Sequence, residues 1–202
     1  MCEYLHLPLQ SGSNRVLGRM HRGYTRERYL ELIAELLETV PDLALSTDLI
    51  VGFPGETEDD FAQTVDMVER VRYDNVFAFR YSRRPGTPAA TWEDQVPEAV
   101  KAERNTRILE VATRVGSERS RALVGQTVEV LVDGVSRKRA GEVAGRTRCN
   151  RVVNFDPRGR ELYGETVSVL VAEALPHSLR GELVGTGEDA ADAVLQTSRE
   201  AP

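Results

Sequence analysis

The sequence predicts an α/β chain in two parts: alternating strands and helices come first, and a small antiparallel β-barrel follows. Strand patterns begin near residues 4, 43 and 75, with helical patterns between them. That spacing is typical of β/α units, so we expect a parallel sheet or part of a barrel. After Gly125 the pattern changes to short strands with glycine turns, which favours a small barrel. We place the domain boundary near residue 120, between residues 1–120 and 121–186.

The first elements follow from helix caps and apolar spacing. Tyr4–Leu9 is the first expected strand, and Ser13 is placed to cap a short helix. Thr25 can cap a longer helix whose apolar residues have helical spacing and which ends at Pro41. Leu43–Val51 is a near-continuous apolar run, which suits a parallel strand buried on both faces.

The next elements complete the α/β part. Thr57–Asp60 is similar to a capping box, and its acids favour the start of a helix. Asn75–Tyr81 is the third expected strand. The prolines and glycine of Pro85–Pro88 begin a linker, and a long helix is expected from Pro97 to about Ala122.

The second part is predicted to contain short strands separated by turns. The candidate strands are Thr127–Val132, Ala140–Arg146, Arg151–Phe155 and Thr166–Ala172. The tail, residues 187–202, is polar and is expected to be disordered.

Composition is typical of a soluble globular protein, with 41% hydrophobic and 29% charged residues among 202. No apolar run approaches the roughly 20 residues that cross a bilayer, and we see no signal peptide, so we expect no membrane association and a cytoplasmic location. The two cysteines, Cys2 and Cys149, do not suggest a disulfide framework. The three histidines have no metal-ligand spacing, so no metal site is predicted.

A glycine-proline-glycine turn, Gly52–Gly55, follows the second strand and is the strongest indication of a ligand pocket. Glycines at the carboxyl end of a strand let the backbone approach a bound molecule. The ends of the three strands, near Gln10-Ser11, Asp48–Glu56 and Phe79–Ser82, are expected to converge on one rim suited to a polar ligand such as a nucleoside. A plain tight turn is an equal alternative. P-loop and dinucleotide-binding glycine patterns are absent from the sequence.

A basic block lies inside the acidic chain, whose formal net charge is −6. Between Gly134 and Arg160 there are eight Lys/Arg and two acids. Strand alternation would place Arg146 and Arg148 on one face, where both can reach successive phosphates. The alternative is a solvated charged face with no ligand.

Five segments together resemble the radical S-adenosylmethionine methylthiotransferases. Four of these segments lie in the α/β part: Leu5–Ser13, Tyr24–Tyr29, Thr47–Thr57 and Tyr81–Ala89. The fifth, Gly145–Phe155, is similar to the core of the RNA-binding TRAM domain that ends those enzymes. The resemblance covers about residues 1–185. It implies the C-terminal portion of a (β/α) radical SAM barrel with a linker helix, then an OB-like TRAM barrel.

The resemblance also implies ligands. S-adenosylmethionine would be bound by Gln10, Ser11, Asp48, Gly52, Phe79 and Tyr81. The tRNA anticodon stem-loop would be held by Lys138, Arg146, Arg148 and Arg151, and its binding would weaken steeply with salt. The chain is expected to act as a monomer. No catalytic residue is assigned.

Within the family the chain looks most like the branch that methylthiolates N6-dimethylallyladenosine at tRNA position 37. Related branches act on threonylcarbamoyladenosine or on a ribosomal protein. The intact enzymes carry two 4Fe-4S clusters, one on a CxxxCxxC motif and one on three earlier cysteines. Two cysteines cannot hold either cluster. We therefore expect a C-terminal part of such an enzyme that is inactive alone, or an RNA-binding module only.

Overall fold

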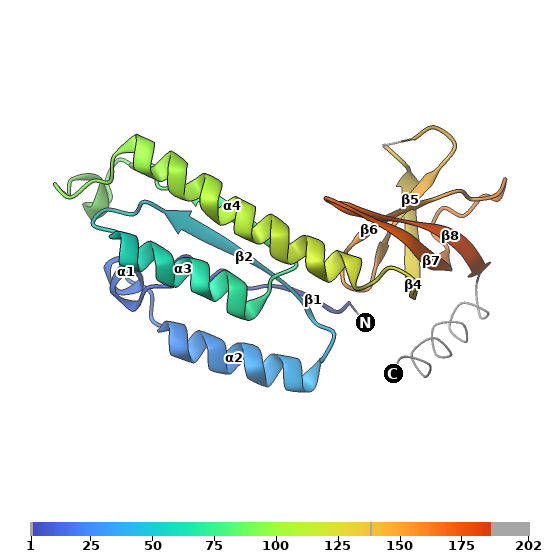
Figure 1. Ribbon diagram of the computed structural model, residues 1–202, viewed down its shortest axis with the longest axis horizontal. Helices are drawn as coiled ribbons and strands as arrows, with labels where there is room; N and C mark the ends of the chain where they lie inside the picture. Colours follow the sequence, from blue (N-terminus) through green and yellow to red (C-terminus); the bar gives the residue numbers. More distant parts are fainter. Residues whose placement is uncertain (1, 138, 187–202) are drawn as a thin grey trace. The chain divides into compact units, whose positions relative to one another are not determined.

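The computed structural model describes residues 2–137 and 139–186, which form two compact units (Figure 1). Leu5–Gly116 form the first unit. The residues from Ser117 onward form the second, together with those before Leu5. The predicted RNA contact Lys138 and the predicted disordered tail, residues 187–202, lie outside the described residues.

The first unit is a three-stranded sheet with helices. Its strands lie in the order β1-β2-β3, and β2 and β3 are parallel. A parallel bridge between Gln10 and Leu49 extends the contact beyond β1. In chain order the elements are β1 (Tyr4–His6), α1 (Asn14–Arg19), α2 (Arg26–Thr39), β2 (Ala44–Val51), α3 (Glu58–Val71), β3 (Asn75–Arg80), the 3-10 turn η1 (Pro88–Ala90) and α4 (Glu98–Arg121). The predicted α/β class is confirmed.

Helices α1, α2 and α3 start at the positions predicted from their capping residues. The Ser13 side chain accepts from the backbone N–H of Val16, and Thr25 accepts from that of Arg28. Thr57 and Asp60 form a complete capping box at α3. Each cap satisfies backbone N–H groups that the first helical turn leaves without partners.

The core lies between one face of the sheet and the helices, which run alongside β2 in Figure 1. Leu45, Leu49 and Val51 are buried in that core, whereas Asp48 and Ile50, on the opposite face of β2, are only half-buried. The other core side chains come from the segment after β1 and from α2, α3, β3 and α4, and include Leu9, Ile33, Phe61, Met67, Val76 and Ile108. The sheet therefore keeps one face accessible to a ligand.

The second unit is a closed barrel of five strands in the order β4-β5-β6-β8-β7. Its strands are β4 (Thr127–Val135), β5 (Val143–Thr147), β6 (Val152–Phe155), β7 (Thr166–Leu175) and β8 (Ser178–Thr186). All pairs are antiparallel except β6 with β8, which are parallel, so the barrel is mixed rather than wholly antiparallel.

Strand β8 was not predicted from the sequence. Its buried residues Leu179 and Leu183 are separated by Gly181 at the intervening position of the same face. A Cβ on Gly181 would lie 2.4 Å from the carbonyl oxygen of Leu170, so no larger residue fits there. The glycine removes the apolar alternation by which a strand is detected.

Asp60 provides a stability test of the first unit. Burial disfavours its charge, but hydrogen bonds from Arg15, Ser13 and Thr57 outweigh burial and hold its pKa well below the ordinary value. A lowered pKa adds stability that is full above the unfolded-state value of about 4 and is lost as pH falls through the folded-state value. We expect Asp60→Asn to lower the free energy of unfolding by about 2 kcal/mol at pH 7, with the difference narrowing below pH 4.

Urea unfolding of both proteins at pH 7 and pH 3 measures this difference. Asp59→Asn is the control, because Asp59 is exposed in the same helical turn. Equal stabilities for the Asp60 and Asp59 variants at pH 7 would contradict the role given to Asp60.

Candidate functional site

A cavity of about 660 Å³ opens at the carboxyl ends of the strands in the first unit. It is lined by Gln10, Asp48, Phe79 and Tyr81, four of the six residues predicted to bind a nucleoside. The three strand ends therefore meet as expected, because parallel strands bring their carboxyl ends to one edge.

Local backbone bonds place the two polar residues of this set. Gln10 has a left-handed φ of 68°. Its N–H donates to the Asp48 carbonyl, and its carbonyl accepts from Ile50, both at 2.9 Å. The Asp48 carboxylate lies 3.5 Å from Nε2 of His6, whose Nδ1 is 2.8 Å from the Ser46 hydroxyl. The backbone bonds thus hold Gln10 beside Asp48 on adjacent segments, and both residues line the cavity.

Aromatic side chains form another wall of the cavity. The Phe53 ring lies edge-on to Tyr81 at 5.1 Å and to Trp92 at 5.8 Å. Phe79 is 53% exposed, so its ring is free to stack on a planar ligand. The Tyr81 hydroxyl is buried and has no hydrogen-bond partner among the residues that the structure describes.

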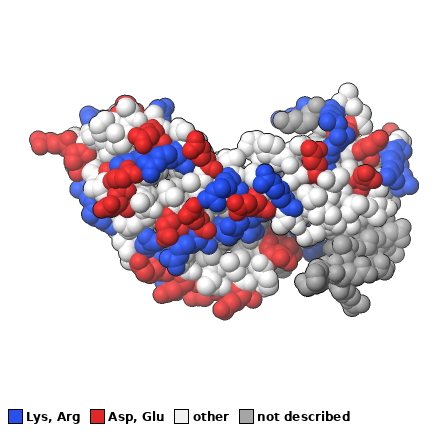
Figure 2. Space-filling view, viewed as in Figure 1, with Lys and Arg blue, Asp and Glu red and all other residues white. Residues whose placement is uncertain are grey.

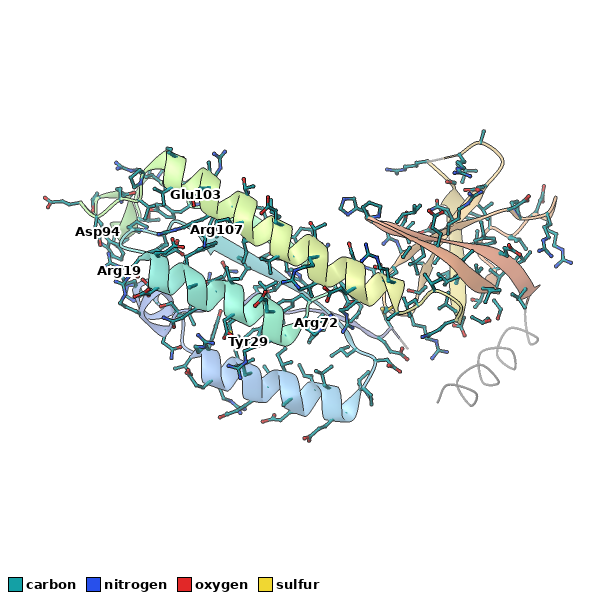
Figure 3. The ribbon with its side chains drawn as sticks, viewed as in Figure 1. Arg19, Tyr29, Arg72, Asp94, Glu103 and Arg107 are labelled. Atoms are coloured by element: carbon teal, nitrogen blue, oxygen red, sulfur yellow. The ribbon has the colours of Figure 1, made fainter. Side chains whose placement is uncertain are left out.

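Arg19 and Trp92 also line the cavity, although neither was predicted from the sequence. The Arg19 guanidinium lies 4.3 Å from the centre of the Trp92 ring. It is also 2.8 Å from the carboxylate of Asp94, and Figure 3 labels both residues of this pair. Trp92 lies in the segment interpreted as a linker, where no periodic pattern indicated a wall.

Ser11 and Gly52, the other two predicted nucleoside contacts, lie beside the cavity without lining it. Ser11 is fully buried, 3.5 Å from the Thr64 hydroxyl. Gly52 has a φ of 72°, and a Cβ there would lie 2.3 Å from Cγ of Lys101. Both residues therefore shape the backbone next to the site.

A buried ion pair holds the glycine turn. Glu56 Oε2 accepts from the Gly52 N–H at 2.7 Å and from Arg104 Nη1 at 2.8 Å. Burial raises the pKa of Glu56, and the bonds from Gly52 and Arg104 oppose that rise. Lys101, also buried, donates to the Tyr81 carbonyl at 3.2 Å. Lys101 and Arg104 were not predicted from the sequence. Their helical spacing with Ile108 indicates that all three lie on the buried side of α4, and this pattern could have identified them.

The second unit carries the predicted RNA contacts. Arg146 and Arg148 are each about half exposed on the barrel. Strand β5 ends at Thr147, so Arg148 lies in the following turn rather than in the strand. Arg151 differs from both, since its guanidinium donates to the Ser120 hydroxyl at 2.6 Å. On the face shown in Figure 2, basic and acidic side chains are interspersed.

The described residues contain no group of three or more His, Cys, Asp or Glu that could hold a metal ion. Cys2 instead donates to the Arg148 carbonyl, and Cys149 lies 3.1 Å from the Thr147 hydroxyl. Among residues 2–137 and 139–186, no helix combines the length and apolar character needed to cross a membrane.

Family models match both units. The radical SAM superfamily matches residues 1–68, and the TRAM domain matches residues 121–184. Both matches agree with the resemblance found in the sequence.

Three similar curated proteins are each named tRNA-2-methylthio-N(6)-dimethylallyladenosine synthase. The proteins of Acetivibrio thermocellus and Moorella thermoacetica are each 51% identical over 184 residues, 91% of this chain. That of Methylacidiphilum infernorum is 47% identical over 191 residues, 95% of this chain. The chain spans 38%, 41% and 41% of these relatives, respectively.

The matches cover the cavity and the barrel in one alignment with each relative. Residues 1–68 therefore match the radical SAM superfamily, residues 121–184 match the TRAM domain, and the chain is similar over most of its length to the tRNA-2-methylthio-N(6)-dimethylallyladenosine synthases.

Proposed function

We propose that this chain takes part in the 2-methylthiolation of N6-dimethylallyladenosine at position 37 of tRNA, and that it acts as a monomer in the cytoplasm. The observation that carries the proposal is the 184-residue match to the named synthases, which spans both the cavity and the barrel. In this proposal the α/β unit, residues 1–120 with the linker helix, binds S-adenosylmethionine. The barrel, residues 121–186, binds the anticodon stem-loop.

The lining of the cavity fits S-adenosylmethionine. Phe79 offers an exposed ring for the adenine, and the Tyr81 hydroxyl is a buried donor without a partner among the described residues. Asp48 supplies a carboxylate for ribose hydroxyls or for the ammonium group, and Gln10 supplies an amide. S-adenosylmethionine, when bound, supplies a methyl group and, on reduction, the radical that removes hydrogen from the adenine ring.

The iron–sulfur clusters of the family do not fit the residues of this chain. Cluster ligation takes several thiolates, and the sequence has two cysteines. Both make hydrogen bonds to the loop around Arg148 in the barrel unit. We therefore assign no electron transfer to these residues. The chain by itself is proposed to bind S-adenosylmethionine rather than to reduce it.

The charge of the cavity favours an anionic partner at its mouth. Its lining includes four arginines, Arg19, Arg22, Arg80 and Arg84, and one acid, Asp48. Arg19 pairs with Asp94, which is not part of the lining, so three arginines remain against Asp48. In a chain of net charge −6, this local excess of positive charge favours the binding of phosphate groups. A nucleotide of the tRNA could thus present its base to the cavity while its phosphates stay at the arginines.

A second candidate function is RNA binding without catalysis, which the TRAM match of residues 121–184 supports. Deletion of the gene, with mass spectrometry of tRNA nucleosides, separates the two. We expect 2-methylthio-N6-dimethylallyladenosine to disappear, its precursor without the methylthio group to accumulate, and the gene supplied in trans to restore the product.

Unchanged 2-methylthio-N6-dimethylallyladenosine after deletion would reject the enzymatic role. Loss of the methylthio group from threonylcarbamoyladenosine, or from a ribosomal protein, would move the chain to one of the related branches.

A further inference from the structure

The two arginines proposed to bind RNA are already paired with carboxylates of the same barrel face. The β4–β5 register places Arg146 directly opposite Leu131. Since side chains alternate along a strand, Glu129 lies on the same face as Leu131. Asp133 lies at the register shift between Val132 and Gly134 and is exposed, as Leu131 is. Arg146 Nε is 3.3 Å from the Asp133 carboxylate. Arg148 Nε and Nη2 are 3.2 and 3.4 Å from the two carboxylate oxygens of Glu129.

A third carboxylate engages Arg148. Oε1 of Glu3 lies 3.6 Å from Arg148 Nη1, and the Glu3 backbone N–H donates to the Arg148 carbonyl at 2.9 Å. The hydrogen bond with Glu129 is the main cause that raises the pKa of Arg148 above its ordinary value. Two guanidinium groups therefore face three carboxylates, so this face carries no excess of positive charge in the free protein.

These pairs can be exchanged for phosphate. Arg146 and Asp133 are each about half exposed, and Arg148 is half exposed beside a Glu129 side chain with 28% exposure. Exposed pairs contribute little stability because water and salt screen them. An RNA phosphate can displace a carboxylate at either arginine, but it then lies near the displaced negative charge.

We propose that Glu129 and Asp133 limit the affinity of the barrel for RNA by competing with phosphate for Arg148 and Arg146. This inference rests on the RNA-binding role proposed above. Each carboxylate that loses its arginine attracts cations, which offsets part of the counterion release when phosphates bind. The two acids therefore lower both the affinity and the steepness of its salt dependence.

The test compares binding of an anticodon stem-loop to the full chain and to a Glu129→Gln/Asp133→Asn variant. We expect the variant to bind the stem-loop about tenfold more tightly at 0.1 M salt, because competition by each exposed ion pair lowers the affinity for RNA by a fewfold. Its plot of log affinity against log salt should be steeper than that of the wild type. The gain should vanish when Arg146→Ala/Arg148→Ala is added.

A matched control separates competition from net charge. Glu161→Gln/Glu182→Gln makes the same charge change at two exposed positions of the second unit for which no ion pair with an arginine is found within the described residues. An equal gain in that control, or unchanged or weaker binding by the Glu129/Asp133 variant, would overturn the inference while leaving RNA binding in place. Absence of binding by the wild type and every variant would reject the RNA-binding role itself, and the inference with it.

Discussion

Arg104→Ala is expected to lower the free energy of unfolding of the first unit by about 3–5 kcal/mol. The Arg104 side chain is 6% exposed and pairs with a Glu56 side chain that is 0% exposed. Removal of the arginine leaves a buried carboxylate whose charge nothing compensates, and such a charge is far more costly than a broken surface pair. The turn that Glu56 ties to Gly52 should loosen, and S-adenosylmethionine binding should be lost with it.

Trp92, the only tryptophan in the sequence, lies on the cavity wall and reports the unfolding of this unit by fluorescence. Arg107→Ala is the matched control, because Arg107 pairs with Glu58 but is 44% exposed. That variant should lose less than about 1 kcal/mol. The combination Arg104→Met/Glu56→Gln should recover most of the stability, because no isolated charge remains. Equal losses for Arg104→Ala and Arg107→Ala would contradict the importance given to the buried pair.

Arg146→Ala/Arg148→Ala is expected to weaken binding of an anticodon stem-loop about 10- to 100-fold at 0.1 M salt. Two phosphate contacts disappear, so the slope of log affinity against log salt should also fall, by less than about 2 because Glu129 and Asp133 offset part of the counterion release in the wild type. Electrophoretic shifts measured at several salt concentrations give both quantities.

Arg158→Ala/Arg160→Ala controls for charge, because both residues are exposed in a turn of the same basic block. That control should keep most of the affinity. Equal affinity of the stem-loop for the Arg146/Arg148 variant and for the wild type would contradict RNA binding through β5 and the turn that follows it.

The local chemistry of the chain is well predicted from its sequence. The start of a helix depends on a few adjacent residues. The starts of three helices were therefore predicted correctly from their capping residues Ser13, Thr25 and Thr57. The convergence of Gln10, Asp48 and Phe79 follows from parallel strands alone, because their carboxyl ends share one edge.

Features that depend on distant partners were not predicted. Arg104 belongs to a helix pattern, and nothing near it in the sequence indicates that it meets Glu56, 48 positions earlier. The basic block was interpreted from its own composition, whereas Arg148 within it is paired with Glu129 on β4 and with Glu3. Long-range pairing of charges is decided by topology, which a local pattern does not contain.

Amide chemical shifts of the isotope-labelled chain, titrated first with S-adenosylhomocysteine and then with an anticodon stem-loop, test the central claim most directly. The first ligand should shift the amides near Gln10, Asp48 and Phe79, and the second should shift those of β4 and β5 around Arg146. Shifts by the nucleoside confined to the barrel, or no saturable shift with either ligand, would contradict an account in which one unit binds the nucleoside and the other binds RNA.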